Sequence, residues 1–365
     1  MKIGKLFFIL LCFCYTAKTQ SIDKIQYILD SSYDKSVFYG NVLITQNNQI
    51  LLEKSYGYAD SNKQKPLTNK NAFQVASISK QFTAYAIMIC QHNGLLHIDS
   101  LVCKYIPTFP YKNIRIKHLL NHSSGLPNFW DQIRPNLDTL KANGNNDVLD
   151  YLIAHPLPLQ FEPGTKFQYC DIGYDFLANI IENVSGQTYQ VFMHNNIFKP
   201  LKMKNTYAYM VTDISRINNK NLAIGHNLVK GKLEYAHLQP QNNFVSYLGN
   251  FYGDGSMVTT ANDLALWSYA LKNCTLLPCD LQALTMDSSI FVRENINYGL
   301  GWFVKNTPTG KLLYHTGGHP GNLHVIYRIP ESNITFIFLS NAETANHRAI
   351  RNRVLDLLNQ YVKIY

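Results

Sequence analysis

Strand-like segments stand at both ends of this chain, and a long, mostly helical stretch separates them. Near the N-terminus, residues 40–45 and 49–53 are rich in β-branched and apolar residues, and the intervening Gln46-Asn47-Asn48 is typical of a hairpin turn. Four further segments near the C-terminus, separated by Gly, Pro and Asn turns, are 300–305, 312–315, 323–329 and 334–340. If both groups join one antiparallel sheet, the two ends of the chain form one unit and its middle is an insertion.

Apolar residues recur at helical spacing in five segments. These are residues 22–32, 78–92, 172–184, 261–272 and 344–361. We therefore expect an α/β (α+β) fold, in which helices flank an antiparallel sheet and an all-α domain is inserted. The α/β part would comprise about 20–75 and 290–365, and the helical part about 76–289. A hydrophobic content of 46% with only 16% charged residues is typical of a globular protein and excludes a disordered chain.

The first residues resemble a secretory signal. Lys2 and Lys5 precede an apolar run that ends at Tyr15, and the small residues Ala17 and Thr19 follow. This layout predicts a signal peptide over 1–19 with cleavage after Thr19, so that the mature chain, 20–365, is exported to the periplasm or secreted. The alternative, a membrane anchor, would need a longer apolar run. No later segment is apolar for long enough to span a membrane. We also expect the mature chain to be a monomer.

Charge and cysteine content narrow the function further. The net charge of +9 falls to +6 without residues 1–19, because that segment holds three lysines and no acid. The remaining charges are scattered, so a nucleic-acid partner is not expected. Cys274 and Cys279 flank a short turn-like stretch and could form a disulfide in an oxidising compartment, whereas Cys90 fits a buried position in a helix. No pattern for a metal, a cofactor or a Gly-x-Ser-x-Gly nucleophile is present.

A Ser-x-x-Lys spacing occurs at Ser77–Lys80 and also elsewhere in the chain, for example at Ser32–Lys35. Only Ser77 lies where a short strand-like run ends and an apolar helix begins, so its hydroxyl would face the positive end of the helix dipole. Lys80 is one turn further on, beside Ser77. A lysine buried there can either accept the serine proton or keep a neighbouring base ionised. The alternative interpretation is a helix-capping serine with a surface lysine.

The segment Val75–Ala84 resembles the active-site helix of the serine β-lactamase and penicillin-binding protein family, in particular its class C β-lactamase and DD-peptidase branch. Further segments resemble that family in the order that it requires: 119–127, 161–169, 255–264, 298–302 and 315–318. The resemblance extends over roughly residues 22–360. It implies a β-lactamase/transpeptidase-like fold and an active site around Ser77.

By this resemblance, Ser77 is the nucleophile, and Lys80 and Tyr169 move its proton. A protonated Lys80 would favour the phenolate form of Tyr169. The family pattern Tyr-x-Asn reads Tyr169-Cys170-Asp171 here. An Asn amide can donate a hydrogen bond to a substrate carbonyl, whereas an ionised Asp only accepts. We therefore predict that Asp171, at the start of a helix, pairs with Lys80 and keeps it charged.

The third motif supplies the remaining substrate-binding residues: His315, Thr316 and Gly318. Many members of the family have Lys where this chain has His315, and a histidine carries only part of a positive charge near neutral pH. Binding of a substrate carboxylate should therefore be weaker. By resemblance, the N–H groups of Gly318 and Ser77 form the oxyanion hole.

These features predict an exported serine hydrolase that works through an acyl-enzyme. Its substrate would be a small molecule or peptide, most plausibly a D-amino-acid peptide or a small ester, and cell-envelope peptidoglycan is a candidate partner. A β-lactamase is one alternative. A non-catalytic penicillin-binding or sensor domain is an alternative of another class.

Overall fold

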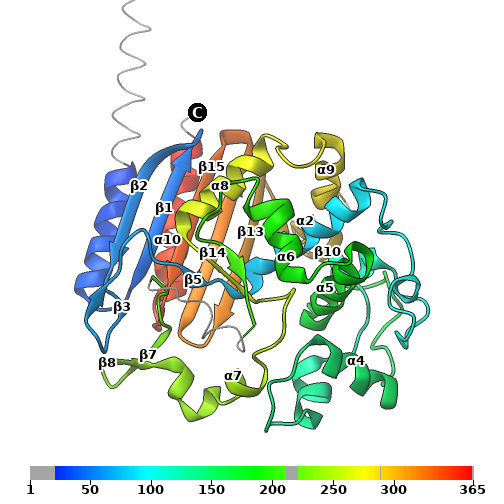
Figure 1. Ribbon diagram of the computed structural model, residues 1–365. Coiled ribbons are helices and arrows are strands. Elements are labelled where there is room, and N and C mark those ends of the chain that lie inside the picture. Colours follow the sequence, from blue (N-terminus) through cyan, green and yellow to red (C-terminus); the bar gives the residue numbers. More distant parts are fainter. Residues whose placement is uncertain (1–20, 211–220, 288, 309, 364–365) are drawn as a thin grey trace, which may run out of the picture.

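The computed structural model describes residues 21–210, 221–287, 289–308 and 310–363 (Figure 1). The predicted signal peptide, 1–19, lies outside the described residues. Within these ranges, none of the helices combines the length and the hydrophobicity that crossing a bilayer requires.

One eight-stranded sheet unites the two ends of the chain, as the order of segments predicted. Its strands, in spatial order, are β10 (Ile290–Arg293), β11 (Ile296–Tyr298), β12 (Phe303–Thr307), β13 (Gly310–His319), β14 (Asn322–Ile329), β15 (Ile334–Ser340), β1 (Gly40–Gln46) and β2 (Gln49–Tyr56). Every neighbouring pair is antiparallel. The N-terminal strands join the C-terminal ones through β1 and β15, where Val42 is paired with Phe338.

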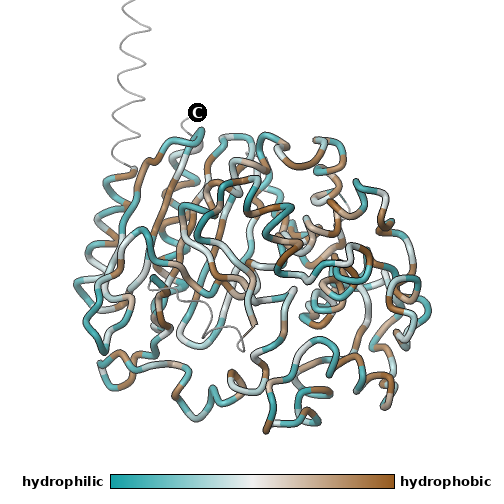
Figure 2. The backbone as a smooth tube through the Cα atoms, viewed as in Figure 1, coloured by the Kyte–Doolittle hydropathy of each residue, from teal (hydrophilic) through white to brown (hydrophobic). Residues whose placement is uncertain are grey.

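Alternating residues of the central strands serve two hydrophobic cores. On one face, Val42, Ile44 and Phe338 pack against the helical residues 21–34 and against α10 (His347–Lys363). On the other face, Leu43 and Leu339 join the core around α2 (Ser79–His92) and α8 (Ala261–Lys272). Figure 2 shows hydrophobic and hydrophilic residues alternating along the first helix, as a helix that covers a sheet requires. The sheet is thus a layer between two helical layers.

The remaining helices form the part that lies beside the sheet. They are α3 (Ile116–Leu120), α4 (Asn145–Ala154), α5 (Asp171–Ser185), α6 (Tyr189–Met193), α7 (Phe244–Tyr247) and α9 (Cys279–Asp287). The predicted segments 78–92, 172–184 and 261–272 are confirmed as α2, α5 and α8. Gly186 follows α5 in the left-handed conformation (φ 67°), which ends the helix at low steric cost.

Short strands also occur within and beside the part that was expected to be helical, although a strand-like run before Ser77 was expected. β5 (Phe73–Gln74), β9 (Met257–Thr259) and β6 (Tyr207–Ala208) form one small sheet, and β16 (Ala342–Glu343), β7 (His226–Val229) and β8 (Lys232–Tyr235) form another. A third pairs β3 (Tyr58–Asp60) with β4 (Lys65–Pro66). The part at 76–289 is therefore mainly, but not wholly, helical. In addition, α8 packs on β15 and β1 of the main sheet.

Two details of the strand predictions need correction. The strand expected from residue 300 begins at Phe303, because Gly301 adopts φ 80° in the preceding turn. The hairpin of β10 and β11 was not predicted, since its strands are short and only partly apolar. The turn at Asn47 and Asn48 is confirmed, and both residues have positive φ, which matches the twist of a two-residue hairpin.

Candidate active site

Ser77 lies in a tight turn between β5 and α2. This turn is the 3₁₀ segment Ala76–Ile78, and α2 begins two residues after Ser77. Ala76 has φ 48°, a conformation that costs an alanine roughly 1–2 kcal/mol and that turns the chain sharply just before Ser77. A Cβ at Gly317 of β13 would lie 2.1 Å from the carbonyl oxygen of Val75. Only glycine therefore lets β13 run this close to the turn.

Lys80 is fully buried beneath Ser77. Its Nζ donates to Ser77 Oγ at 3.1 Å, to Asp171 Oδ1 at 2.8 Å and to the backbone oxygen of Asp254 at 3.0 Å. An ammonium group has three N–H donors, and all three are used. Burial opposes the charge, but Asp171, Tyr169 and Asp254 outweigh it and hold the pKa of Lys80 well above its usual value. The predicted pairing of Asp171 with Lys80 is confirmed. The charged form of Lys80 has no lone pair with which to accept the proton of Ser77.

Two further carboxylates lie close to Lys80. Asp254 Oδ2 is 3.9 Å from Lys80 Nζ, and Asp175 is buried next to Asp254. Burial, together with the neighbouring negative charges, raises the pKa of Asp175 well above its usual range, and burial raises that of Asp254. Both carboxyl groups therefore hold a proton more readily than a solvated carboxyl group does. Sequence reasoning missed both. The available signal was an acid between Gly253 and Gly255, directly before a segment that resembles the family.

Tyr169 precedes α5 and lies beside Lys80, whose Nζ is 4.9 Å from the centre of the phenol ring. Although 36% of the residue is exposed, burial of its hydroxyl raises the pKa of Tyr169 to about 12. Lys80 lowers this pKa, as expected, and so does the side chain of Ser77, while the charge of Asp171 raises it. The direction of the Lys80 effect is as predicted, but the phenol is protonated in the resting site.

His122 supports Tyr169 from behind. The two rings lie 4.2 Å apart at their centres, and His122 Nδ1 accepts a hydrogen bond from the N–H of Cys170 at 3.1 Å. Burial and the nearby charge of Lys80 lower the pKa of His122 well below its usual value, so the ring is neutral. His122 belongs to a segment that resembles the family, but sequence reasoning gave it no role.

His315 lies on β13 and is 1% exposed. Its Nδ1 lies 2.7 Å from the carbonyl oxygen of Thr316 and therefore donates, which leaves Nε2, at 3.0 Å, to accept from the hydroxyl of Tyr298. Burial and the charge of Lys80 lower the pKa of His315 to about 3. The expected partial positive charge is thus absent at neutral pH, and both ring nitrogens are engaged within the protein.

Thr316 and Gly318 follow on the same strand. Thr316 is half-buried and Gly318 is exposed. An added Cβ at Gly318 would touch only the side chain of Leu323, so this part of the strand edge is open. The structure therefore brings Ser77, Lys80, Tyr169 and Asp171 together, and β13 borders their site. Within the described parts of the chain, no cluster of His, Cys, Asp or Glu is suited to hold a metal ion.

The cysteines behave as their positions in the sequence suggested. Cys274 and Cys279 form a disulfide with a Cα–Cα distance of 5.2 Å. Cys90 is buried in α2 as a free thiol. Neither takes part in the site around Ser77.

Comparisons with known proteins agree with this arrangement. A family model described as Beta-lactamase matches residues 35–360. The chain is 32% identical over 322 residues to penicillin-binding protein 4* of Bacillus subtilis (strain 168), a match that covers 87% of this chain and 71% of the relative. Among solved structures, a penicillin binding protein from Bacillus halodurans has a TM-score of 0.78 at 23% identity, covering 91% of this chain and 98% of that one. D-amino acid amidase from Ochrobactrum anthropi SV3 has a TM-score of 0.76 at 23% identity, covering 93% and 99%. At these sequence identities, the two solved structures support the fold alone.

Proposed function

This chain belongs to the Beta-lactamase family, and from that premise we propose that it is a serine hydrolase that cleaves an amide or ester bond through an acyl-enzyme on Ser77. The observation that carries the proposal is the contact of Lys80 Nζ with Ser77 Oγ at 3.1 Å, in a site where Asp171, Tyr169 and Asp254 keep the lysine charged. A surface lysine beside a capping serine would have no such environment.

The contacts of Lys80 assign the proton transfers. Ser77 Oγ accepts an N–H from Lys80, so its own proton is directed elsewhere, and Tyr169 is the neighbouring group that can take it. In the phenolate form, Tyr169 accepts this proton while Ser77 Oγ bonds to the substrate carbonyl carbon. The proton then passes from Tyr169 to the leaving group as its bond to carbon breaks. Water then attacks the ester carbon and gives a proton to Tyr169, which passes it to Ser77 Oγ as the bond from Oγ to carbon breaks, so that the serine hydroxyl and the phenolate are both restored.

The phenolate is scarce at neutral pH. With a pKa of about 12 for Tyr169, ionisation at pH 7 costs roughly 7 kcal/mol, at 1.36 kcal/mol per pKa unit. The charge of Lys80 reduces that cost, since it favours the phenolate over the phenol. Lys80 thus acts on Ser77 through Tyr169 and by orienting Oγ, rather than as the base itself.

The developing oxyanion would be held by the N–H groups of Ser77 and Gly318. The close approach of β13 at Gly317 to the turn before Ser77 supports this assignment, because Gly318 is the next residue and is exposed. Two backbone donors fixed in this way contribute several kcal/mol to a transition state in similar sites.

For the substrate, we propose a D-amino-acid peptide or a small ester. The resemblance of the sequence motifs to the DD-peptidase branch of the family supports the peptide, and cell-envelope peptidoglycan is the candidate source. The neutral His315 offers a substrate carboxylate no charge, which supports the ester and disfavours β-lactams. A β-lactamase remains the second candidate for the same site.

Intact-mass analysis tests the proposal with an aryl ester, a penicillin and a D-Ala-D-Ala peptide. The wild type should form an acyl adduct and turn over at least one of them, and Ser77→Ala should do neither. Ser32→Ala is the matched control, because Ser32 shares the Ser-x-x-Lys spacing but donates to the backbone of Ile28. No adduct and no hydrolysis with any substrate would refute the proposal that this protein is an enzyme. A lasting adduct without turnover would instead identify a penicillin-binding sensor.

We also propose that the protein acts outside the cytoplasm, as a monomer. The disulfide between Cys274 and Cys279 supports export, because such bonds persist in oxidising compartments. Mass analysis of the protein from the extracytoplasmic fraction should give a chain that begins at Gln20. A chain that retains residues 1–19 would contradict the proposed cleavage.

A further inference from the structure

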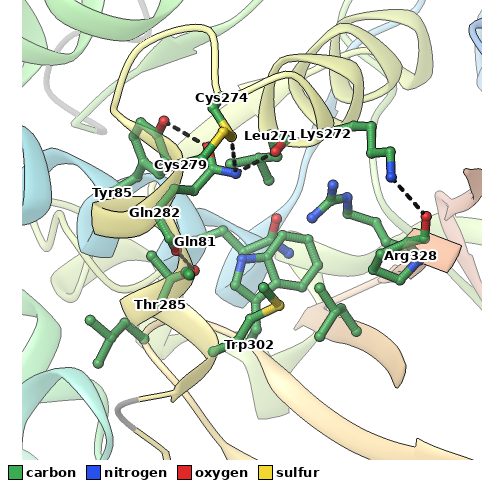
Figure 3. Close-up of a pocket in the computed structure, with 15 residues that line it drawn as sticks. Gln81, Tyr85, Leu271, Lys272, Cys274, Cys279, Gln282, Thr285, Trp302 and Arg328 are labelled. Atoms are coloured by element: carbon green, nitrogen blue, oxygen red, sulfur yellow. Dashed lines mark hydrogen bonds between the residues drawn. A yellow bond between two sulfur atoms is a disulfide. The ribbon is translucent and has the colours of Figure 1, made fainter. Parts of the chain in front are cut away.

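A cavity of about 220 Å³ adjoins α2 on the side of α8 and α9 (Figure 3). None of the proposed catalytic residues lines it. The lining residues are Gln81, Tyr85, Leu271, Lys272, Cys274, Cys279, Gln282, Ala283, Thr285, Met286, Leu300, Trp302, Leu313, Arg328 and Pro330. Most are apolar and none is acidic, although two of them are cations.

Arg328 places a buried guanidinium in this cavity. The residue is 8% exposed, and its side chain donates to Ser268 Oγ at 2.8 Å and to the Ser268 carbonyl at 3.2 Å. A guanidinium has five N–H donors, so others remain. Among the described residues, no carboxylate forms an ion pair with Arg328, and burial lowers its pKa to about 10. Figure 3 shows the side chain extending into the cavity toward Gln81 and Trp302, over whose ring the guanidinium lies at 5.6 Å. A buried charge of this kind calls for a counter-ion.

Gln81 adds a second donor without a partner. Its Oε1 accepts from the indole N–H of Trp267 at 3.1 Å. Because an indole can only donate, this bond fixes the amide with its nitrogen on the other side. There Nε2 is buried and has no hydrogen-bond partner within the described chain. Leaving such a donor unsatisfied costs about 1–3 kcal/mol.

We propose that this cavity is a binding site for a small organic anion, namely a carboxylate on a compact apolar body. Arg328 and Gln81 bind the carboxylate, while Leu271, Leu300 and Trp302 surround the apolar part. A cavity of about 150 Å³ is enough for benzene, so this one accepts a molecule the size of benzoate. Lys272, exposed at the edge and bonded to the carbonyl of Pro330, adds positive charge there.

The site is placed to influence the catalytic helix. Gln81 follows Lys80 directly, and a Cβ at Gly301 would lie 2.8 Å from both the Lys80 carbonyl and Gln81 Cα. Gly301, which stands between the lining residues Leu300 and Trp302, therefore packs directly against the backbone of Lys80. Binding itself does not depend on the proposed hydrolase activity.

Calorimetric titration at low salt tests the site with benzoate as the probe. Benzamidine, of the same shape but cationic, and inorganic phosphate, which lacks the apolar body, are the comparison ligands. We expect benzoate to bind more tightly than both, with Arg328→Met weakening its binding at least tenfold. Arg353→Met, which removes an exposed arginine of α10, should have no effect.

A second variant covers the case in which Arg328→Met fails to fold. Ala283→Phe, on α9, keeps Arg328 and Gln81 but fills the cavity, and it should also abolish benzoate binding. Benzoate binding that survives both substitutions would place it elsewhere and overturn the proposal. Equal or tighter binding of benzamidine or phosphate would also overturn it, and so would no binding of benzoate to the wild type.

Discussion

Replacing Asp171 by Asn tests how the charge on Lys80 is maintained. At 2.8 Å and an effective dielectric constant of 20, the attraction between the two charges is about 6 kcal/mol. The amide oxygen introduced at position 171 can still accept a hydrogen bond from Lys80 Nζ. The carboxylate of Asp254 also remains close to Lys80 Nζ. Breaking a buried pair costs about 3–5 kcal/mol, and we expect the lower end, about 3 kcal/mol of unfolding free energy, together with a lower pKa of Lys80.

The direction in which this contribution to stability changes with pH follows from the same contacts. The pKa of Lys80 is raised in the folded state, so its contribution to stability is complete below the pKa of an unfolded lysine. That contribution is lost as pH rises through the raised value. Urea unfolding at pH 7 is therefore the right measurement. Asp99→Asn is the matched control, since the pair of Asp99 and Lys117, at 2.6 Å, is about half exposed and is worth less than about 1 kcal/mol. Equal losses in the two variants would refute the reasoning.

The same substitution should change catalysis in the opposite direction. Asp171 raises the pKa of Tyr169, and both groups lie beside Lys80. With Tyr169 partly exposed, removing this charge should lower its pKa by about 1 unit. In the wild type, kcat/KM for an aryl ester should rise about tenfold per pH unit from pH 7 to 10. Asp171→Asn should shift that rise to lower pH by about one unit. An unshifted profile, or an unchanged preference between amides and esters, would refute the proposed role.

Three other perturbations have definite expected outcomes. Burial lowers the pKa of His315 and of His324 to about 3 each, so both are neutral when folded and the unfolded chain takes up protons first as pH falls below 6.5. Stability should fall by about 2 kcal/mol per histidine by pH 5, and urea unfolding that is flat from pH 8 to 5 would contradict this. Replacing Cys274 and Cys279 together by Ser opens a short loop and should cost about 2 kcal/mol, whereas an unchanged unfolding midpoint would mean that the loop is rigid without the bond. Gly301→Ala adds a Cβ at φ 80° against the backbone of α2 and should lower the unfolding free energy by more than 1 kcal/mol. A variant as stable as the wild type would contradict this expectation.

The parts of the fold that the sequence predicted are those with a strong local signal. The β-branched and apolar residues of β1 and β2, the Asn47-Asn48 turn and the periodic apolar residues of α5 each favour their own structure. The short strands β6 to β9 lack such a signal, because two to four residues form a strand only when a partner is already in place. Their pairing depends on the tertiary structure.

The same distinction applies to the site. Ser77 and Lys80 could be singled out by their spacing and their place at a helix start, and Asp171 by the resemblance of Tyr169-Cys170-Asp171 to the second motif of the family. The pairing of Asp254 with Asp175 could not, since 79 positions separate the two residues and only the fold brings them together. The sequence also does not show whether a given residue is buried in the fold.

His315 shows what burial changes. As a sequence position it offers a partial positive charge, yet in the fold its ring is neutral and fully hydrogen-bonded. Lys80, the cation beside the nucleophile, is bonded to Asp171, so neither residue attracts a substrate carboxylate. Arg328, a buried cation to which the described residues offer no carboxylate, lies in a separate cavity. An organic anion should therefore bind beside α2 rather than at Ser77, and benzoate should leave the KM of a neutral ester unchanged while altering kcat. A purely competitive effect of benzoate would refute this separation of anion binding from catalysis.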